Sequence, residues 1–396
     1  MKKKIAIFTG NRAEYGLQYS IIKAIKDHKN LDYKLIISGS HLDKKFGETK
    51  KVIKKDKFKI SCEIKLKNYS KKELSFTPLN ISEIIKKLTI YLKKNRPDIF
   101  LINADRFETF AAGIAATQMN IPTVHIEGGD ITEGGTLDDN VRHALTKLSH
   151  LHFVTNKKSF NNLIKMGEEK WRIYNVGLAS NDIIKKNNLL NEKTIEKNFK
   201  ISLSSRILLF TFHAFGTDLK KMNKDICILA KVISFYLNKN YVIIATYPNN
   251  DYGSDVIINK LIEIKKLNKK NKNFILKKSL GNSLFYSLLA LAKKNKIILV
   301  GNSSAGIKEC IAFKCPAVNI GERQKSRLKP INVIDSKCTF KNITFNISKA
   351  FDGKIFKKKL LQGKNPYYKN NTGKKIANII NKLCLNKKIL NKKHIL

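Results

Sequence analysis

Short apolar segments alternate with longer amphipathic segments along most of the chain, and this pattern predicts strands alternating with helices. In the first half, the apolar runs that predict strands span residues 4–10, 33–38, 98–104, 122–128, 151–156 and 172–177. Between them, apolar residues recur at three- and four-residue spacing, as in ISEIIKKLTIYLKKN and TFAAGIAATQMN, which predicts helices. Regular alternation of this kind requires a mainly parallel sheet with helices on both faces.

The pattern breaks at residues 180–204, which are polar and rich in Asn and Lys and are interpreted as a hinge plus a helix. A second series of predicted strands follows, at 206–214, 241–248, 273–280, 296–302 and 316–321. A chain of 396 residues is also long for a single core. The predicted fold class is therefore α/β, with two doubly wound Rossmann-like domains facing across a cleft. Their predicted limits are 1–180 and 181–370, followed by a terminal helix and tail at 371–396.

Composition narrows the function classes. The net charge is +46, but the lysines are spread along the whole chain rather than gathered in one patch, which argues against nucleic acid as the main partner. Such a positive field should speed the capture of an anionic substrate. The basic N-terminus leads into an apolar run too short for a signal peptide, and no membrane-spanning stretch follows, so a cytoplasmic chain is expected. Six cysteines without a CxxC pair predict reduced thiols rather than a zinc site.

Ligands of parallel sheets bind at the carboxyl ends of the strands, and two such ends in the first half carry unusual polar residues. The segment TGNRAEYG (9–16) places Arg12 where a phosphate or carboxylate would bind, although a plain turn with a solvated arginine is an equal alternative. The segment NADRFE (103–108) brings Asp105 out of a buried strand. Asp105 is either an acid/base candidate or the N-cap of the next helix.

A third strand end carries the densest polar sequence, HIEGGDITEGGTLDDNVRH (125–143). Glu127 follows the strand directly, and a glycine-rich loop leads to a helix that opens near Asp138. Crowded carboxylates repel one another, which raises at least one pKa and supplies both an acid and a base. The alternative is a flexible loop in which Asp138 only caps the helix. Arg142, four residues after Asp138, is placed either to anchor a diphosphate or to orient that acid.

The second domain contributes a fourth group. His213 ends a predicted strand, and VGNSSAGIKEC (300–310) is a strand, a turn of small residues and a helix start. The hydroxyls and backbone N–H groups of Ser303 and Ser304 would form a phosphate cradle, and Glu309 would accept hydrogen bonds from ribose. Arg323 lies in the next such turn. A core histidine and an ordinary Ser-Ser cap are the competing interpretations of the same residues.

The combination GNRAEYG, ADRFE, HIEGGDITEGG…DDNVRHALTKLSHLHF, GNSSAGIKE and IGERQ resembles the UDP-N-acetylglucosamine 2-epimerase family. It is most similar to the hydrolysing branch that serves sialic-acid and legionaminic-acid biosynthesis, in order along nearly the whole chain. The resemblance implies a GT-B-like pair of Rossmann domains, a homodimer or homotetramer, and no metal or redox cofactor. It also implies a reaction in which a nucleoside diphosphate is eliminated from a 2-acetamido sugar. Water then adds with inversion at C2, which releases the free sugar of manno configuration.

The resemblance assigns roles residue by residue. Asp105, Glu127 and Asp138 match the acid/base carboxylates, and His213 matches the essential histidine near the phosphates. The matches to nucleotide-binding positions are Arg12, Arg142, Ser303, Ser304, Glu309 and Arg323.

Three departures from the family pattern, Leu17, Asn103 and Ala104, bear on the substrate. They leave open whether the sugar nucleotide is UDP-N-acetylglucosamine or a 2,4-diacetamido-6-deoxy sugar on UDP or GDP. Which carboxylate removes the C2 proton is also open. A glycosyltransferase on the same scaffold is the alternative enzyme, and a nucleic-acid-binding protein is the alternative of another class.

Overall fold

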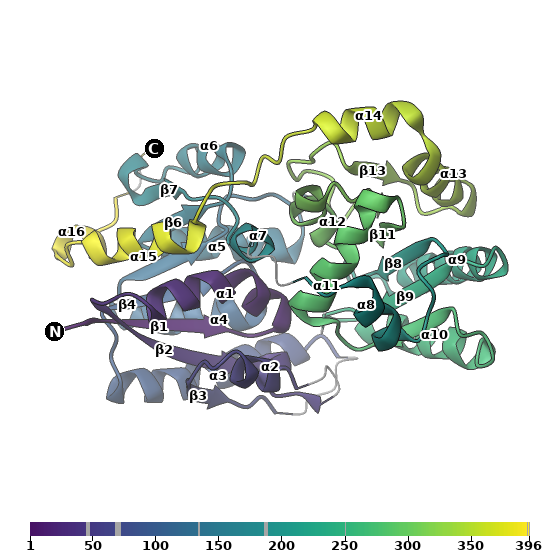
Figure 1. Ribbon diagram of the computed structural model, residues 1–396. Coiled ribbons are helices and arrows are strands. Elements are labelled where there is room, and N and C mark those ends of the chain that lie inside the picture. The colour runs from purple at the N-terminus through teal and green to yellow at the C-terminus, as the bar shows by residue number, and fades with distance from the viewer. Residues whose placement is uncertain are drawn as a thin grey trace. The chain divides into compact units, whose positions relative to one another are not determined.

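The computed structural model describes residues 1–44, 48–67, 73–133, 135–185, 189–249, 251–393 and 395. The chain divides into two compact units (Figure 1). The first unit comprises Met1–Lys186 and Tyr367–Leu396, and the second comprises Asn187–Pro366. Each unit is built on its own parallel sheet.

The first unit has a seven-stranded sheet in the order β3-β2-β1-β4-β5-β6-β7, in which all the paired strands run parallel. Strand order reverses between β1 and β4, and side chains that follow these two strands share one edge of the sheet. The strands are β1 (Lys3–Thr9), β2 (Leu31–Ser38), β3 (Ile60–Ile64), β4 (Ile99–Asn103), β5 (Thr123–Ile126), β6 (Leu151–Val154) and β7 (Ile173–Asn175).

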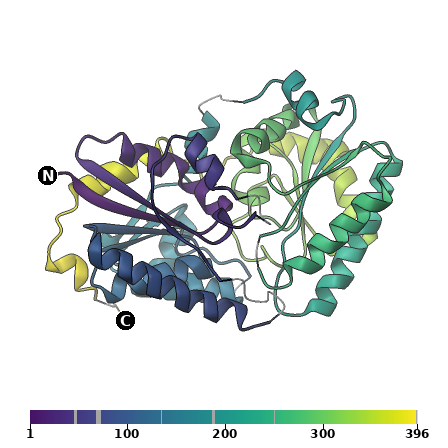
Figure 2. The ribbon, with the colours of Figure 1, turned by 90° about the horizontal axis from the view of Figure 1, so that it is seen from below.

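Helices cover both faces of this sheet (Figure 2). Alternate residues of β1 separate the two cores, because Ile5 and Ile7 pack on one face while Ala6 and Phe8 pack on the other. The helices α1 and α15 supply the first core, and α3 and α4 supply the second. The helices of this unit are α1 (Arg12–Lys26), α2 (Lys50–Lys55), α3 (Phe76–Lys94), α4 (Phe107–Gln118), α5 (Leu137–Leu148), α6 (Lys157–Lys165), α7 (Ser180–Lys185), α15 (Thr372–Lys382) and α16 (Lys387–Leu390).

The second unit repeats the arrangement with six parallel strands in the order β10-β9-β8-β11-β12-β13. Its principal core lies between this sheet and the helices α9, α10 and α13. The strands are β8 (Ile207–Thr211), β9 (Val242–Thr246), β10 (Phe274–Lys277), β11 (Ile297–Gly301), β12 (Ala317–Ile320) and β13 (Val333–Ser336). The helices are α8 (Glu192–Phe199), α9 (Leu219–Asn238), α10 (Ser254–Leu267), α11 (Gly281–Ala290), α12 (Ala305–Lys308), α13 (Phe340–Asp352) and α14 (Lys354–Gln362).

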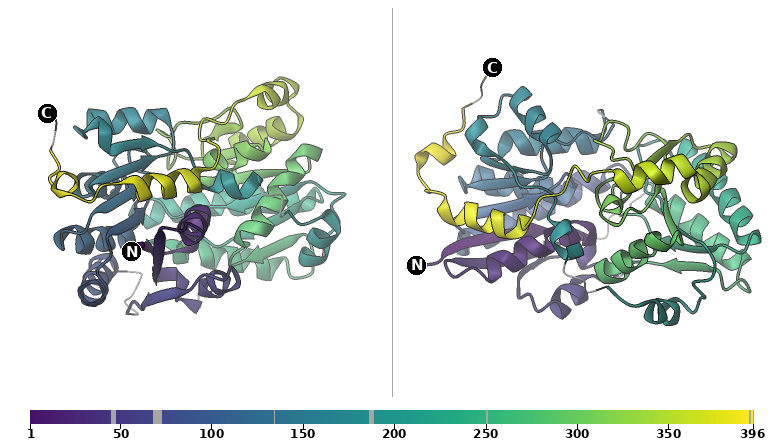
Figure 3. Two further views of the ribbon diagram at one scale, coloured as in Figure 1. Left: turned by 60° about the vertical axis from the view of Figure 1, so that its left-hand side comes forward. Right: turned by 45° about the horizontal axis from the view of Figure 1, so that its top comes forward.

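The C-terminal segment returns to the first unit, where α15 packs against α1 (Figure 3). Gly373 permits this close approach, because a Cβ there would lie 2.4 Å from the carbonyl oxygen of Ser20. Lys3 fixes the far end of α15 by donating from Nζ to the carbonyls of Ile380, Asn381 and Leu383 at 2.9, 3.0 and 2.9 Å. A cation at the carbonyl end of a helix is electrostatically favourable.

The predicted fold class of two Rossmann-like domains is confirmed, and all the predicted strands are present. The sequence pattern missed β3 and β13, each of which forms an edge of its sheet. An edge strand is only partly covered and therefore lacks the continuous apolar run that marks a central parallel strand. Within the described ranges, no helix has both the length and the apolar content needed to cross a bilayer.

Candidate active site

The turn after β4 presents Asp105 in a constrained backbone. Ala104 has a φ of +64°, in the left-handed region that favours glycine. Its N–H donates to the carbonyl of Ile126 at 2.9 Å, and its own carbonyl accepts from Nε2 of His125 at 2.8 Å. Strand β5 therefore holds Ala104 from both sides. These bonds fix the direction in which Asp105 leaves the sheet.

Arg142 pairs directly with Asp105. It lies on α5 with only 1% of its side chain exposed, and its Nη2 donates to Oδ2 of Asp105. Its Nη1 donates to a carboxylate oxygen of Asp139 and, at 2.8 Å, to the carbonyl of Asp130. Both ends of the guanidinium are thus engaged with protein oxygens. Of the two roles expected for Arg142, this geometry favours orienting a carboxylate, although the carboxylate is Asp105 rather than Asp138.

Asp139 organises the acidic loop before α5. Its two carboxylate oxygens accept from the backbone N–H groups of Thr132 at 2.8 Å and Glu133 at 3.1 Å, and from the Thr136 hydroxyl at 3.1 Å. Thr136 in turn caps the helix by accepting from the N–H of Asp139 at 3.2 Å. Capping therefore falls to Thr136 rather than to Asp138, and Asp139 was not singled out by the sequence analysis.

Glu127 and Asp138 frame the same loop. Glu127 directly follows β5, has a φ of +67° and is 4% exposed. Its N–H donates to the carbonyl of Phe153 at 2.9 Å, which ties it to β6. Asp138 is half-buried at the start of α5. Asp105 and Glu127 thus follow the carboxyl ends of β4 and β5, and Asp138 lies in the first turn of α5, while Gly134 of the loop lies outside the described residues.

A buried carboxyl pair that the sequence analysis missed consists of Glu14, in the first turn of α1, and Glu108, in the first turn of α4. Glu14 accepts from the N–H of Gly10 at 2.7 Å and from the Thr109 hydroxyl at 3.1 Å. Burial, together with the nearby charge of Glu108, raises the pKa of Glu14 to about 8. Glu108 is itself fully buried, and Arg106 lies 3.5 Å from it. Arg12 is the first residue of α1, and its side chain lies outside the described part of the chain.

In the second unit, Asn302 joins the ends of β8 and β11. Its Oδ1 accepts from the N–H of His213 at 2.7 Å, and its Nδ2 donates to the His213 carbonyl at 2.9 Å. The His213 ring accepts at Nδ1 from the N–H of Asn249 at 3.1 Å, which assigns the proton of the neutral ring to Nε2. Gly301 is required beside it, because a Cβ there would lie 1.9 Å from the carbonyl oxygen of Thr211.

Arg323 joins the same cluster by donating from Nη1 to the Asn302 carbonyl at 3.2 Å. Ser303 and Ser304 form the turn between β11 and α12, and the Ser303 hydroxyl accepts from the N–H of Ala305 at 3.3 Å. Because α12 spans only Ala305–Lys308, a phosphate there would rely on the N–H groups of the turn more than on a helix dipole.

Glu309 follows α12. Its Oε1 accepts from the hydroxyl of Tyr286 at 2.5 Å. A hydroxyl that donates to one carboxylate oxygen fixes the orientation of the whole carboxyl group. Tyr286 comes from α11, so Glu309 is held in place by a neighbouring helix rather than by its own turn.

Two Rossmann-like domains, one with oriented carboxylates at its strand ends and the other with a small-residue turn and a histidine, define a class of enzymes that act on nucleotide-linked substrates. Residues 23–381 match the family model described as UDP-N-acetylglucosamine 2-epimerase. The chain belongs to this family. The prediction of the family is thereby confirmed, and with it the prediction of an enzyme.

Curated relatives and solved structures extend the comparison. The chain is 35% identical to the GDP/UDP-N,N'-diacetylbacillosamine 2-epimerase (hydrolyzing) of Campylobacter jejuni, over 85% of each chain. It is 31% identical to the UDP-N,N'-diacetylbacillosamine 2-epimerase (hydrolyzing) of Legionella pneumophila, over 99% of each chain. The structure of UDP-GlcNAc 2-epimerase from Neisseria meningitidis bound to UDP-GlcNAc has the same fold, with a TM-score of 0.76 at 21% identity over 96% of this chain and 99% of that chain.

Proposed function

We propose that the protein is a hydrolysing 2-epimerase that converts a nucleoside-diphosphate 2,4-diacetamido-6-deoxy sugar and water to the free manno-configured sugar and the nucleoside diphosphate. The proposed chemistry rests on one observation: Asp105, which follows β4, forms an ion pair with the buried Arg142. Family membership limits the reaction to C2 of a nucleotide sugar. The relatives named for N,N'-diacetylbacillosamine, 35% and 31% identical to this chain, favour the diacetamido sugar over UDP-N-acetylglucosamine.

The carboxylates of the first unit serve the proton transfers. In the first step a carboxylate removes the C2 proton, the C1–O bond to the diphosphate breaks, and a C1–C2 double bond forms. In the second step water adds its oxygen to C1, and C2 receives a proton on the opposite face. Asp105, Glu127 and Asp138 are the proposed acid/base groups, because an acid/base catalyst must be an oriented carboxyl group within reach of the reacting carbon.

The second unit is proposed to hold the leaving nucleotide. Departure of a diphosphate requires donors that meet its developing negative charge. His213, with its proton on Nε2, and the turn of Ser303 and Ser304 offer such donors. Arg323 adds positive charge to these donors, and Glu309 is the proposed ribose acceptor. Arg12 and Arg142 belong to the first unit and stay predicted nucleotide-binding positions, although the contacts of Arg142 favour its role beside Asp105.

Turnover in heavy water tests this function. The protein is incubated with the UDP- and GDP-linked diacetamido sugars and with UDP-N-acetylglucosamine, and the products are analysed by NMR and mass spectrometry. We expect free sugar carrying one deuterium at C2, with the highest kcat/KM for a diacetamido substrate. Release of unlabelled sugar would contradict the elimination, and transfer to an added acceptor with C2 untouched would indicate a glycosyltransferase.

Variants at the proposed site refine the same assay. Asp105→Asn, Glu127→Gln, Asp138→Asn and His213→Ala should each lower kcat by about a hundredfold or more while leaving the fold intact. Near-normal rates in all of them would refute the site assignment without refuting the family.

We also expect a homodimer or homotetramer that works in the cytoplasm. All six cysteines are free, as is typical of a reducing compartment. Light scattering gives the mass of the assembly in solution, and a monomer at working concentration would contradict the expectation.

A further inference from the structure

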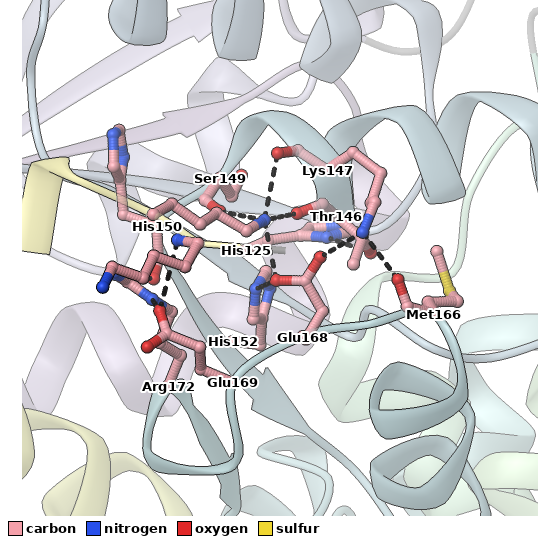
Figure 4. A network of polar contacts seen from close by, with 12 residues as sticks. His125, Thr146, Lys147, Ser149, His150, His152, Met166, Glu168, Glu169 and Arg172 are labelled. Carbon is pink, nitrogen blue, oxygen red and sulfur yellow. Dashed lines mark hydrogen bonds and ion pairs between the residues drawn. The ribbon is translucent and has the colours of Figure 1, made fainter. Parts of the chain in front are cut away.

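A buried polar network fastens the C-terminal segment to the first unit (Figure 4). Lys392 lies just beyond α16, and its side chain is 7% exposed. Its ammonium donates to the carbonyls of Thr146, Lys147 and Ser149 at 2.7, 3.0 and 2.9 Å, and it lies 2.7 Å from Oε2 of Glu168. The three carbonyls belong to the C-terminal end of α5, where the backbone lacks intrahelical donors. Lys392 therefore supplies that helix end with donors and positive charge.

Glu168 and Arg172 stabilise Lys392 and its segment in this position. Glu168 is fully buried and also accepts from Nε2 of His152 at 2.9 Å and from Lys147 at 3.1 Å. Burial disfavours the ionised Glu168, but the hydrogen bonds and charges of His152 and Lys392 outweigh it and hold its pKa at about 2. Arg172 completes the attachment by donating to the carbonyls at the end of α16, which are Lys388, Ile389 and Asn391.

A series of hydrogen bonds leads from Lys392 through Thr146 and His125 to Ala104, the residue before Asp105. Thr146 offers its carbonyl to Lys392, and its hydroxyl lies 3.3 Å from Nδ1 of His125. Burial lowers the pKa of His125 to about 3, so the ring is neutral and carries one proton. Because Nε2 uses that proton to bind the Ala104 carbonyl, Nδ1 is left as the acceptor for Thr146. Asp105 is the next residue after Ala104.

The same helix end also supports the partner of Asp105. Thr146 lies one turn after Arg142 on α5, and its hydroxyl also lies 3.1 Å from the Arg142 carbonyl, so its one proton is shared between that carbonyl and Nδ1 of His125. Lys392 therefore binds the backbone of Thr146, whose hydroxyl lies within hydrogen-bonding distance of both His125 and the Arg142 carbonyl. The family match ends at residue 381, before Lys392. The path therefore depends on a residue that lies outside the range of the family model.

We infer that Lys392 is a positioning residue for catalysis, which holds the end of α5 so that Asp105 and Arg142 meet in the reactive geometry. It touches neither substrate nor reacting atoms. A displacement of about 1 Å at a catalytic group is enough to cost about a hundredfold in rate. The inference rests on the proposed 2-epimerase activity for its kinetic test, and a second measurement is independent of that activity.

The test compares Lys392→Met with Lys387→Met in the full-length protein. Methionine keeps the aliphatic stem and removes the charge and the donors, while Lys387 is exposed at the start of α16 and serves as the matched control. We expect Lys392→Met to lower kcat by about tenfold or more with KM changed by less than about twofold, because substrate binding groups are untouched. Lys387→Met should match the wild type.

Hydrogen exchange measured by mass spectrometry gives the independent result. Peptides covering residues 104–108 should exchange about fivefold faster in Lys392→Met, because the bonds that hold Ala104 are loosened, while peptides of the second unit should not change. Should Lys392→Met fail to fold, Lys392→Gln is measured against the same thresholds.

The outcomes separate the two hypotheses. Wild-type kcat in the Lys392 variant, or a loss fully accounted for by its unfolded fraction, overturns the inference. If the wild type turns over no sugar nucleotide, the proposed function fails and hydrogen exchange alone decides: faster exchange at 104–108 supports the role of Lys392, and unchanged exchange overturns it.

Discussion

Replacing Glu14 with glutamine should remove a loss of stability that the first unit undergoes as the pH rises from about 4.5 to about 8. Glu14 is completely buried, and its pKa rises from 4.5 to about 8 because of burial and the nearby Glu108. The folded protein therefore keeps a proton on Glu14 up to about pH 8, whereas the unfolded chain releases it near pH 4.5. Between these values folding takes up a proton, so the stability contributed by this group falls as the pH rises. The amide introduced by Glu14→Gln is neutral at every pH and escapes this loss.

The size of this change in stability follows from the linkage between proton binding and folding. While the folded state alone holds the proton, each pH unit lowers the free energy of unfolding by about 1.4 kcal/mol. From pH 5.5 to 7.5 the full effect is therefore about 2.7 kcal/mol. The amide can keep both contacts, since its oxygen accepts from Gly10 while its NH2 donates to the Thr109 hydroxyl. We expect the variant to gain at least about 1 kcal/mol on the wild type over this interval.

Urea unfolding at the two pH values measures the effect. The single tryptophan, Trp171, lies in the first unit, so its fluorescence reports the unfolding of that unit. The control is Glu73→Gln, which neutralises an exposed carboxylate of the same unit. Should Glu14→Gln and the wild type lose stability in parallel between pH 5.5 and 7.5, the buried protonated carboxyl would be refuted.

Three further outcomes are expected. Arg142→Lys, which cannot bridge Asp105 and Asp139 with a planar fork, should lower kcat by about a hundredfold in steady-state assays with little change in thermal stability. Ala104→Gly should raise the free energy of unfolding by about 1 kcal/mol or less, because glycine adopts the positive φ without strain, and chemical denaturation measures the gain. Asn302→Ala, which removes both side-chain bonds to the histidine backbone, should weaken binding of the free nucleoside diphosphate by about tenfold in calorimetry.

The central strands were predictable because their burial is visible in the residues of each strand alone. A parallel strand that is covered on both faces must be apolar throughout, and β4, with Ile99–Asn103 all buried, shows this in its sequence. The edge strands β3 and β13 are only partly buried and can therefore include polar residues, so the sequence pattern did not distinguish them from loops. The turns that follow the strands were predictable as candidate sites, because in a parallel sheet these turns lie at one edge of the sheet.

Partnerships across the fold were not predictable in this way. Arg142 was expected either to anchor a diphosphate or to orient Asp138, four residues before it on the same helix face. Instead it pairs with Asp105, which follows β4, and with Asp139. Sequence spacing reports only neighbours on one element, and the first of these partners is 37 residues away. Glu14 and Glu108 were missed for the same reason, because each is an ordinary first-turn acid until the fold places them together.

The C-terminal segment shows which contacts a local pattern leaves out. Residues 371–396 are predicted from sequence to be a terminal helix and a tail, with no role for any particular lysine. Two lysines fasten this segment in the same way, each placing an ammonium among three carbonyls at the end of a helix. Lys3, from β1, binds the end of α15, and Lys392, from the segment itself, binds the end of α5. In a chain with 77 basic residues, nothing in the sequence distinguishes these two lysines from the solvated ones. Only the position of free carbonyl groups does so, and that position is a property of the completed fold.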